Sequence, residues 1–163
     1  MATKTPIYTG RLSKDFRYPE MIKSSTAERL GISNEASIEH VINLVNLCNF
    51  ILQPAREEFG IININSGYRS PALNKAVGGS KTSQHCNGQA ADFESSHISN
   101  PDLAKWIEKN LEFDQLILEF YDGVDPNSGW IHCSYVLDGS NRNKTMTALR
   151  VNGKTSYKPG LLS

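Results

Sequence analysis

The sequence has no surplus of charge, no long apolar run and no repeated segment. Its 163 residues carry 17 Lys and Arg against 17 Asp and Glu, so the formal net charge is zero. A chain without a basic field does not favour a nucleic acid or an anionic membrane as its partner. No apolar run approaches the length of a membrane-spanning helix. These features are typical of a globular protein, and we expect one domain over residues 1–163.

Cysteine is scarce as well. The three cysteines, Cys48, Cys86 and Cys133, are odd in number and show no C-x-x-C spacing, which argues against a disulfide framework. We expect Cys86 and Cys133 to be small apolar core residues. Because neighbours in a strand point to opposite faces, Cys133 should face away from any metal held by His132.

The N-terminal residues Met-Ala-Thr-Lys-Thr-Pro lack the apolar stretch of a secretory leader. We therefore expect synthesis in the cytoplasm without a signal peptide. If the substrate lies outside the cell, another component must release or deliver the protein. Residues 1–11 are predicted to form an extended arm.

Local signals predict a mixture of helices and strands. Short helices are expected near 19–23 and over 25–30, and a longer amphipathic helix over about 38–59, bent or split at Pro54 and ended by Gly60. Further helices should begin after Ser70 and after Ser99 or Asn100. Strands are expected over 61–65, 89–93, 114–121 and 130–136.

Two pairs of strands should form hairpins. Residues 122–129 have turn composition, so we expect them to join the strands over 114–121 and 130–136. Asn152 and Gly153 favour a tight type I′ turn between 146–151 and 154–157. This second hairpin and a tail account for residues 137–163.

One stretch, residues 83–92, holds a histidine and an aspartate seven positions apart. Neutral imidazole and carboxylate groups are natural zinc ligands. We place His85 on a polar loop over 80–88 and Asp92 on the strand that follows. His132, in a second strand, is the expected third ligand. Three protein ligands with one open position are the pattern of a catalytic zinc site.

The pattern Ser-x-His-x-x-Gly-x-Ala-x-Asp, followed later by Trp-x-His, resembles the zinc D-Ala-D-Ala carboxypeptidase group (subfamily A of peptidase family M15), which shares its fold with the hedgehog signalling domain. All five fixed positions of the first motif are present: Ser83, His85, Gly88, Ala90 and Asp92. The resemblance also includes residues 65–71 and 12–32, and it ends near 135. It implies an α+β fold with a small antiparallel sheet that carries the zinc site and helices packed on one face.

The resemblance further implies a zinc-dependent peptidase that hydrolyses peptidoglycan stem peptides. Either a D-Ala-D-Ala carboxypeptidase or an L-Ala-D-Glu-type endopeptidase would fit. A compact chain of this type is similar to bacteriophage endolysins or virion components that degrade the cell wall, and we expect a monomer. The alternative is a non-catalytic, zinc-stabilised binding or phage structural module. Both alternatives predict bound zinc, so only turnover of a muropeptide separates them.

Such a peptidase needs a carboxylic acid besides the metal. The acid takes a proton from the attacking water and passes it to the leaving amine. Related enzymes often carry it three residues before the last histidine, where this chain has Gly129. We expect Glu119 to replace it, because a symmetric hairpin places Glu119 nearly opposite His132. A one-residue slip would leave Asp122 or Asp125 as candidates; otherwise these two are turn-forming acids.

Four more residues are candidates for the substrate side of the site. Arg69 occupies the position where the resembling peptidases keep an arginine that faces the substrate. Its planar guanidinium suits a developing oxyanion or a substrate carboxylate, although a surface salt bridge is the alternative. Ser83 and Gln84 could bind the peptide beside the metal or cap their own loop, and Tyr68 is a further candidate for substrate binding.

Three other ring side chains are expected to have structural roles. We expect Trp130 to pack beneath the ligands and His97 to be solvent-exposed, although His97 could line the cleft. His40, on the long helix, is expected to be a surface or capping residue.

Overall fold

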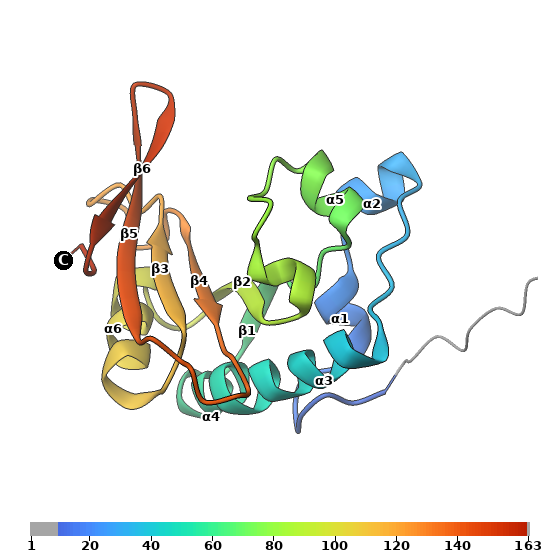
Figure 1. Cartoon of the computed structure of the whole chain (residues 1–163). Coiled ribbons are helices and arrows are strands. Elements are labelled where there is room, and N and C mark those ends of the chain that lie inside the picture. Colours follow the sequence, from blue (N-terminus) through green and yellow to red (C-terminus); the bar gives the residue numbers. More distant parts are fainter. Residues whose placement is uncertain (1–9, 163) are drawn as a thin grey trace, which may run out of the picture.

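A computed structural model describes residues 10–162 as one six-stranded sheet with helices around it (Figure 1). Most of the predicted arm, residues 1–9, lies outside the described residues. The helical elements are α1 (Tyr18–Ile22), α2 (Ser25–Leu30), α3 (Ile38–Leu47), the π-helical turn η1 (Cys48–Leu52), α4 (Gln53–Phe59), α5 (Pro71–Ala76), the 3-10 turn η2 (Gln84–Asn87) and α6 (Asn100–Asn110). The strands are β1 (Ile62–Ser66), β2 (Ala90–Ser95), β3 (Gln115–Glu119), β4 (Trp130–Ser134), β5 (Lys144–Val151) and β6 (Lys154–Pro159).

The long helix predicted over 38–59 is present as α3, η1 and α4 in direct succession. Pro54 accounts for the π-helical turn, because a proline has no amide hydrogen to donate to the carbonyl four residues before it. Gln53, just before the proline, donates instead to the carbonyl of Cys48, five residues back. The proline therefore makes one turn of the helix wider but does not end the helix.

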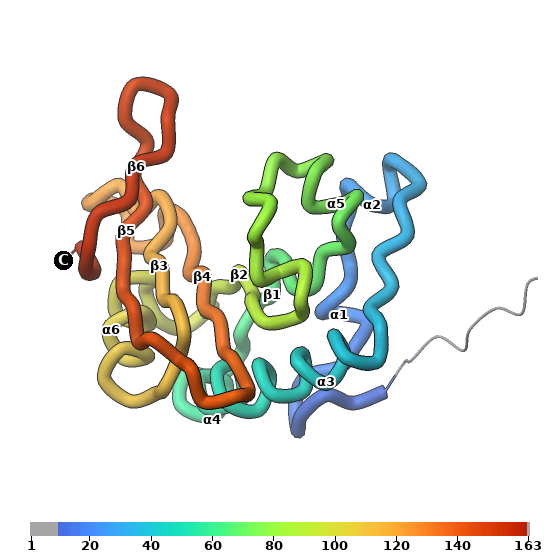
Figure 2. The backbone as a smooth tube through the Cα atoms, in the orientation of Figure 1, coloured from blue at the N-terminus to red at the C-terminus, as the bar shows by residue number. Residues whose placement is uncertain are grey.

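The strand order is β1-β2-β4-β3-β5-β6, with β4 and β3 at the centre. All neighbouring strands run antiparallel except β3 and β5, which are parallel. The expectation of a purely antiparallel sheet is therefore wrong. The reason is the connection from β4 to β5, residues 135–143, which passes the start of β3 (Figure 2). Strand β5 therefore begins at the same end of the sheet as β3 and runs in the same direction.

Both predicted hairpins are confirmed, but the register of the first differs from the expectation. Glu119 pairs with Trp130, and Ile117 is the residue opposite His132. The pairing is centred one residue earlier than a symmetric loop about Asp125 would give. In the second hairpin Asn152 and Gly153 have φ angles of 50° and 75°, as a type I′ turn requires.

The alternation of side chains gives the sheet two different faces. On one face, side chains of β2, β3 and β4 pack into a core with α3, η1, α4 and α6. Cys133 is part of this core, as predicted, and so is Cys48 on η1. The same prediction is wrong for Cys86, which is only half-buried on η2 and lies outside the core. All three cysteines are free thiols. The other face carries Asp92, His132 and Glu119. The helices that cover the core face leave this second face open for a site.

Within residues 10–162, no helix has both the length and the apolar character that a membrane crossing requires.

Gly129, at the end of the β3–β4 loop, generates a prediction about stability. It has a φ of 69°, and a Cβ at this position would collide with the carbonyl oxygen of Glu119 and lie 2.7 Å from the carbonyl carbon of Phe120. Gly123, in the same loop, has a φ of 81° and no atom within 4 Å of such a Cβ. We expect Gly129→Ala to lower the free energy of unfolding by about 3 kcal/mol, and Gly123→Ala by about 1 kcal/mol.

Urea unfolding followed by circular dichroism would measure both losses. The Gly123 variant reports the cost of positive φ alone, so the difference between the two variants isolates the collision with the backbone. Equal losses in the two variants would contradict the close approach at Gly129.

Candidate metal centre

Two neighbouring strands and one short turn bring three metal-ligating side chains together. Asp92 on β2 and His132 on β4 are direct partners across the antiparallel pair, so their side chains project from the same face. His85 comes from η2. The prediction that His85 lies on an irregular loop needs correction, because residues 84–87 form a 3-10 turn.

The sequence of η2 explains how it holds His85. The Ser83 hydroxyl accepts a hydrogen bond from the His85 amide at 3.3 Å and so caps the turn. Gly88 ends the turn in the left-handed conformation, with a φ of 71°. A Cβ on Gly88 would lie 2.5 Å from the carbonyl oxygen of His40 on α3. The glycine of the motif therefore allows the turn to rest directly on a helix.

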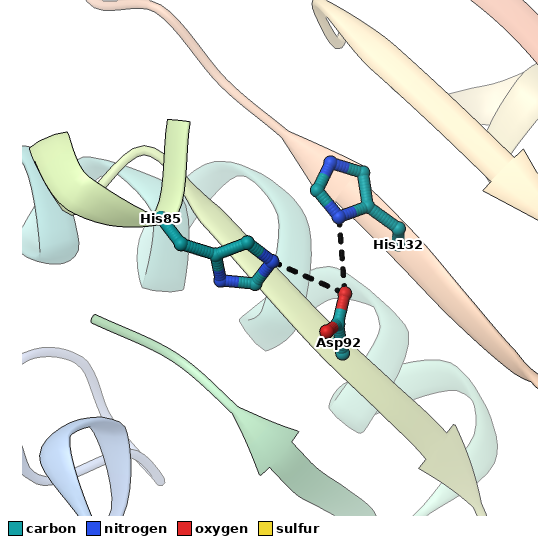
Figure 3. Close-up of side chains that lie close together, drawn as sticks. All are labelled: His85, Asp92 and His132. Carbon is teal, nitrogen blue, oxygen red and sulfur yellow. Dashed lines mark hydrogen bonds and ion pairs between the residues drawn. The ribbon is translucent and has the colours of Figure 1, made fainter. Parts of the chain in front are cut away.

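Figure 3 shows the two imidazole rings pointing at the same carboxylate oxygen. Nε2 of His85 lies 3.3 Å from Oδ1 of Asp92, and Nδ1 of His132 lies 3.0 Å from the same atom. All three ligand atoms lie within 4.8 Å of one another, and the three residues are buried. Around a tetrahedral zinc with bonds of about 2.0–2.1 Å, ligand atoms are separated by roughly 3.3–3.5 Å. The group therefore has the donor types and the spacing for a metal ion.

The outer atoms of the ligands are already hydrogen-bonded, which supports this assignment. Nδ1 of His85 lies 2.7 Å from the carbonyl oxygen of Gly67. Since a carbonyl can only accept, Nδ1 is the protonated nitrogen and Nε2 presents its lone pair to the centre. On Asp92, Oδ2 accepts from Arg69 at 3.0 Å, which leaves Oδ1 for the centre. Such outer partners orient metal ligands and fix their tautomers.

Burial and charge set the protonation states at the centre. Burial alone would raise the pKa of the Asp92 carboxyl, but the facing imidazoles of His85 and His132 hold that pKa well below its ordinary value. Burial lowers the pKa of His85, although the Asp92 carboxylate opposes this shift. A charged carboxylate and a neutral imidazole are the forms that bind metal.

Arg69 is half-buried beside the metal centre and pairs with Asp92, so it does not form the surface salt bridge considered from the sequence. Its guanidinium donates to Asp92 Oδ2 at 3.0 Å, to the Ser66 hydroxyl at 2.9 Å and to the Asn74 side chain at 3.4 Å. Its amide also donates to the carbonyl of His85 at 3.1 Å. Arg69 thus connects η2 to the Asp92 carboxylate, and its role toward a substrate stays a prediction.

The centre opens into a cleft of about 690 Å³. Asp92, His132, Ile117 and Met146 are register partners on β2, β4, β3 and β5, so they form a row across the floor of the cleft. At about 4.8 Å per strand, this row extends roughly 14 Å from Asp92. Residues 78–85, which include the start of η2, border the cleft on the other side. A short extended peptide fits such a groove.

Glu119, the predicted acid, lines this cleft at the end of β3. Because Glu119 pairs with Trp130, it is a diagonal neighbour of His132 on the same face of the sheet. The backbones of diagonal neighbours are about 7–8 Å apart, which is farther than those of two directly paired residues. Burial raises the pKa of the Glu119 carboxyl, the charge of Asp92 raises it further, and His132 and Arg69 oppose the shift. A long side chain can bridge a diagonal spacing of this size.

The other substrate-side candidates separate into two groups. Ser83 and Gln84 line the cleft, and Trp130 lines it too, next to the ligands. Among residues 10–162, the indole nitrogen of Trp130 is buried without a hydrogen-bond partner. Tyr68 is buried and stacks at a tilt against His40, with ring centroids 5.4 Å apart, and it does not border the cleft.

The two loop acids and His97 lie outside the centre. Asp122 accepts from the amides of Val124 and Asp125, and Asp125 accepts from that of Asn127, so both shape the hairpin loop. His97 packs near Gly60, at the entry to β1, and not along the cleft.

Among the cleft residues that were not predicted, three lie beyond the matched motifs: Arg142, Met146 and Tyr157. They come from the segment after β4, where the sequence carries no recognisable motif. Tyr157 pairs with Ala148, which pairs with Glu119, so the tyrosine lies on the row of the acid. Only the parallel pairing of β5 with β3 brings these residues to the site, and no local signal encodes that pairing.

A family model described as Peptidase M15 matches residues 14–134 of the chain. This range contains the three ligands, Arg69 and Glu119, and it ends at the last residue of β4. No curated protein matches the chain.

The contacts of Arg69 generate a prediction about metal affinity. Arg69→Lys keeps a positive charge but loses the planar fork that joins Asp92 to Ser66. We expect the variant to bind a divalent metal about 10–100-fold more weakly, as is usual when an outer partner of a ligand is lost. Competition with a chromophoric chelator would measure this affinity. Arg56→Lys, on α4 away from the cleft, serves as the control, and equal affinities for both variants would refute the role of Arg69.

Proposed function

The chain belongs to the Peptidase M15 family, and on this basis we propose that it is a zinc-dependent peptidase that hydrolyses peptidoglycan stem peptides. The observation that carries the proposal is the convergence of two imidazole nitrogens and one carboxylate oxygen at the edge of a peptide-sized cleft. Family membership supports a metallopeptidase. Zinc as the metal and peptidoglycan as the substrate are our proposal.

The donor set favours zinc. Two imidazole nitrogens and a carboxylate oxygen leave one tetrahedral position open, as catalytic zinc sites do. A bound zinc ion would polarise the scissile carbonyl and lower the pKa of a water molecule toward neutrality. Calcium and magnesium prefer sites made of oxygen ligands. The three residues that would hold the zinc are His85, Asp92 and His132.

The protein's own residues supply the remaining steps. Glu119, with its raised pKa, is the group that would take the proton of the attacking water and pass it to the leaving amine. Arg69 holds Asp92 in place through a hydrogen bond, and it lines the cleft in which an oxyanion would develop. Ser83 and Gln84 border the same cleft and would hold the peptide next to the centre.

The polar cleft is compatible with a stem peptide that carries carboxylates. Both a D-Ala-D-Ala carboxypeptidase and an L-Ala-D-Glu-type endopeptidase are consistent with it. A bacteriophage endolysin or virion component that degrades the cell wall is the biological setting we propose, on the resemblance of the sequence motif.

Incubation with purified peptidoglycan, followed by mass spectrometry of the released fragments, would test this function. We expect the zinc-loaded protein to release stem-peptide fragments and a chelator to abolish the release. His132→Ala should lose both zinc and activity, because two ligands hold the ion far less tightly than three. His97→Ala, a histidine away from the cleft, should keep one zinc per chain.

The outcomes separate the two functional classes. If the wild type binds zinc but releases no fragment from any wall preparation, the binding-module alternative replaces the peptidase. If His132→Ala keeps full zinc, the ligand assignment is wrong.

Glu119→Gln tests the proposed acid. Glutamine keeps the shape of the side chain but cannot carry the proton, so we expect unchanged zinc content and a loss of turnover of about 10²–10⁴-fold. Asp125→Asn in the hairpin loop should cleave at nearly the wild-type rate. The assignment is overturned if Glu119→Gln cleaves normally while Asp122→Asn or Asp125→Asn does not.

A further inference from the structure

Arg142 lies in the connection between β4 and β5, eight residues beyond the range that the family model matches. It nevertheless lines the same cleft as His85, Asp92 and His132. The segment from 135 onward thus adds a cationic side chain to a site whose metal ligands all come from the family region. This position is where a feature particular to this chain would be found.

A buried carboxylate holds Arg142 in place. Asp114, at the start of β3, is only 3% exposed. Its Oδ1 accepts from the amide of Arg142 at 3.1 Å and from Nε at 2.8 Å, and its Oδ2 accepts from NH2 at 2.8 Å. The hydrogen bonds from Arg142 hold the pKa of the Asp114 carboxyl below its ordinary value. This two-point pairing fixes the plane of the guanidinium.

The same carboxylate also holds Gln84. Nε2 of Gln84 donates to Asp114 Oδ2 at 2.8 Å, the oxygen that accepts from Arg142 NH2. Gln84 is the direct neighbour of the ligand His85. Because one oxygen binds both groups, Asp114 links the guanidinium of Arg142 to the turn that carries His85.

The other edge of the guanidinium is free to bind a ligand. Asp114 occupies Nε and one side of NH2, and within residues 10–162 no partner is seen for NH1 of Arg142. The side chain is 54% exposed and lines the cleft, so a ligand in the cleft can reach it. A guanidinium edge with two parallel N–H groups matches a carboxylate in geometry and charge. Since Arg142 is already oriented, a carboxylate would bind there with little loss of side-chain entropy.

We propose that Arg142 is a specificity-determining residue that binds a carboxylate of the peptide substrate near the metal centre. This inference rests on the proposed peptidase function. The carboxylate could be the C-terminal group of the peptide or the side-chain group of an acidic residue, and both share the chemistry that Arg142 recognises. The enzyme should therefore discriminate between a peptide with a free carboxylate and its carboxamide.

Three synthetic stem peptides would test the proposal. One has all carboxylates free, one has the side-chain carboxylate amidated, and one has the C-terminal carboxylate amidated. Zinc-loaded wild type should show a KM about 10-fold or more higher for one amidated peptide, which also identifies the carboxylate that is bound. Arg142→Gln should show no preference for the free carboxylate, and Arg142→Lys a reduced one.

The ratio of kcat/KM between two peptides does not depend on the fraction of active enzyme, so partial unfolding of a variant does not affect it. If Arg142→Gln does not fold, the ratio can be measured with Arg142→Lys, for which we expect a smaller preference than that of the wild type. Arg150→Gln is the matched control: Arg150 lies on β5 over the ring of Phe120, outside the cleft, and its ratio should equal that of the wild type.

Two results overturn the inference while the peptidase function stands. Either the wild type cleaves all three peptides with equal kcat/KM, or Arg142→Gln keeps the full preference of the wild type. If the wild type cleaves none of the peptides and no peptidoglycan, the proposed function itself fails, and the inference fails with it.

Discussion

The carboxylate of Asp92 is the point on which the whole site depends. A buried charge is costly unless neighbouring groups compensate for it, and three groups from three different parts of the chain do so here. His85 and His132 face one oxygen, while Arg69 binds the other. The charge therefore draws a 3-10 turn, a strand and the loop after β1 to one place, and the same arrangement suits a metal ion.

Strand register makes this convergence possible. Asp92 and His132 meet because they are direct partners in the β2–β4 pair. Since side chains alternate between the two faces, a slip of one residue would turn one of them into the apolar core. The neighbours Phe93 and Cys133, which are fully buried, resist such a slip because it would bring them into the cleft. Core packing on one face thus secures the ligand geometry on the other.

The position of the acid follows from backbone geometry. Gly129 adopts a left-handed conformation in which any Cβ would meet the backbone of Glu119 and Phe120, so the chain cannot carry an acidic side chain there. Glu119, the acid we propose, lines the cleft from the neighbouring strand as a diagonal neighbour of His132. The reaction requires only that a carboxyl group lie near the metal centre. Residues on neighbouring strands can reach that place, so the acid need not stand at position 129.

The β5–β6 hairpin widens the cleft beyond the family region. Because β5 pairs parallel to β3, the floor continues past Ile117 to Met146, and Arg142 and Tyr157 reach the opening. Asp114 accepts hydrogen bonds both from Arg142, in the segment after β4, and from Gln84 on η2. These hydrogen bonds connect the segment after β4 to the turn that carries His85.

The sequence by itself determined the features that depend on local spacing. The ten residues from Ser83 to Asp92, with the later His132, were enough to predict the three side chains that converge into a group able to hold a metal ion. Turn chemistry predicted both hairpins. The sequence also marked Pro54 as a point where the long helix would bend or split, and the structure has a π-helical turn there in a helix that continues. Tertiary structure alone decided the residue opposite His132, the burial of Tyr68, the pairing of Arg69 with Asp92, and the presence of Arg142 in the cleft. These depend on strand register and on a parallel pairing between distant segments, and contacts over such separations have no local signature.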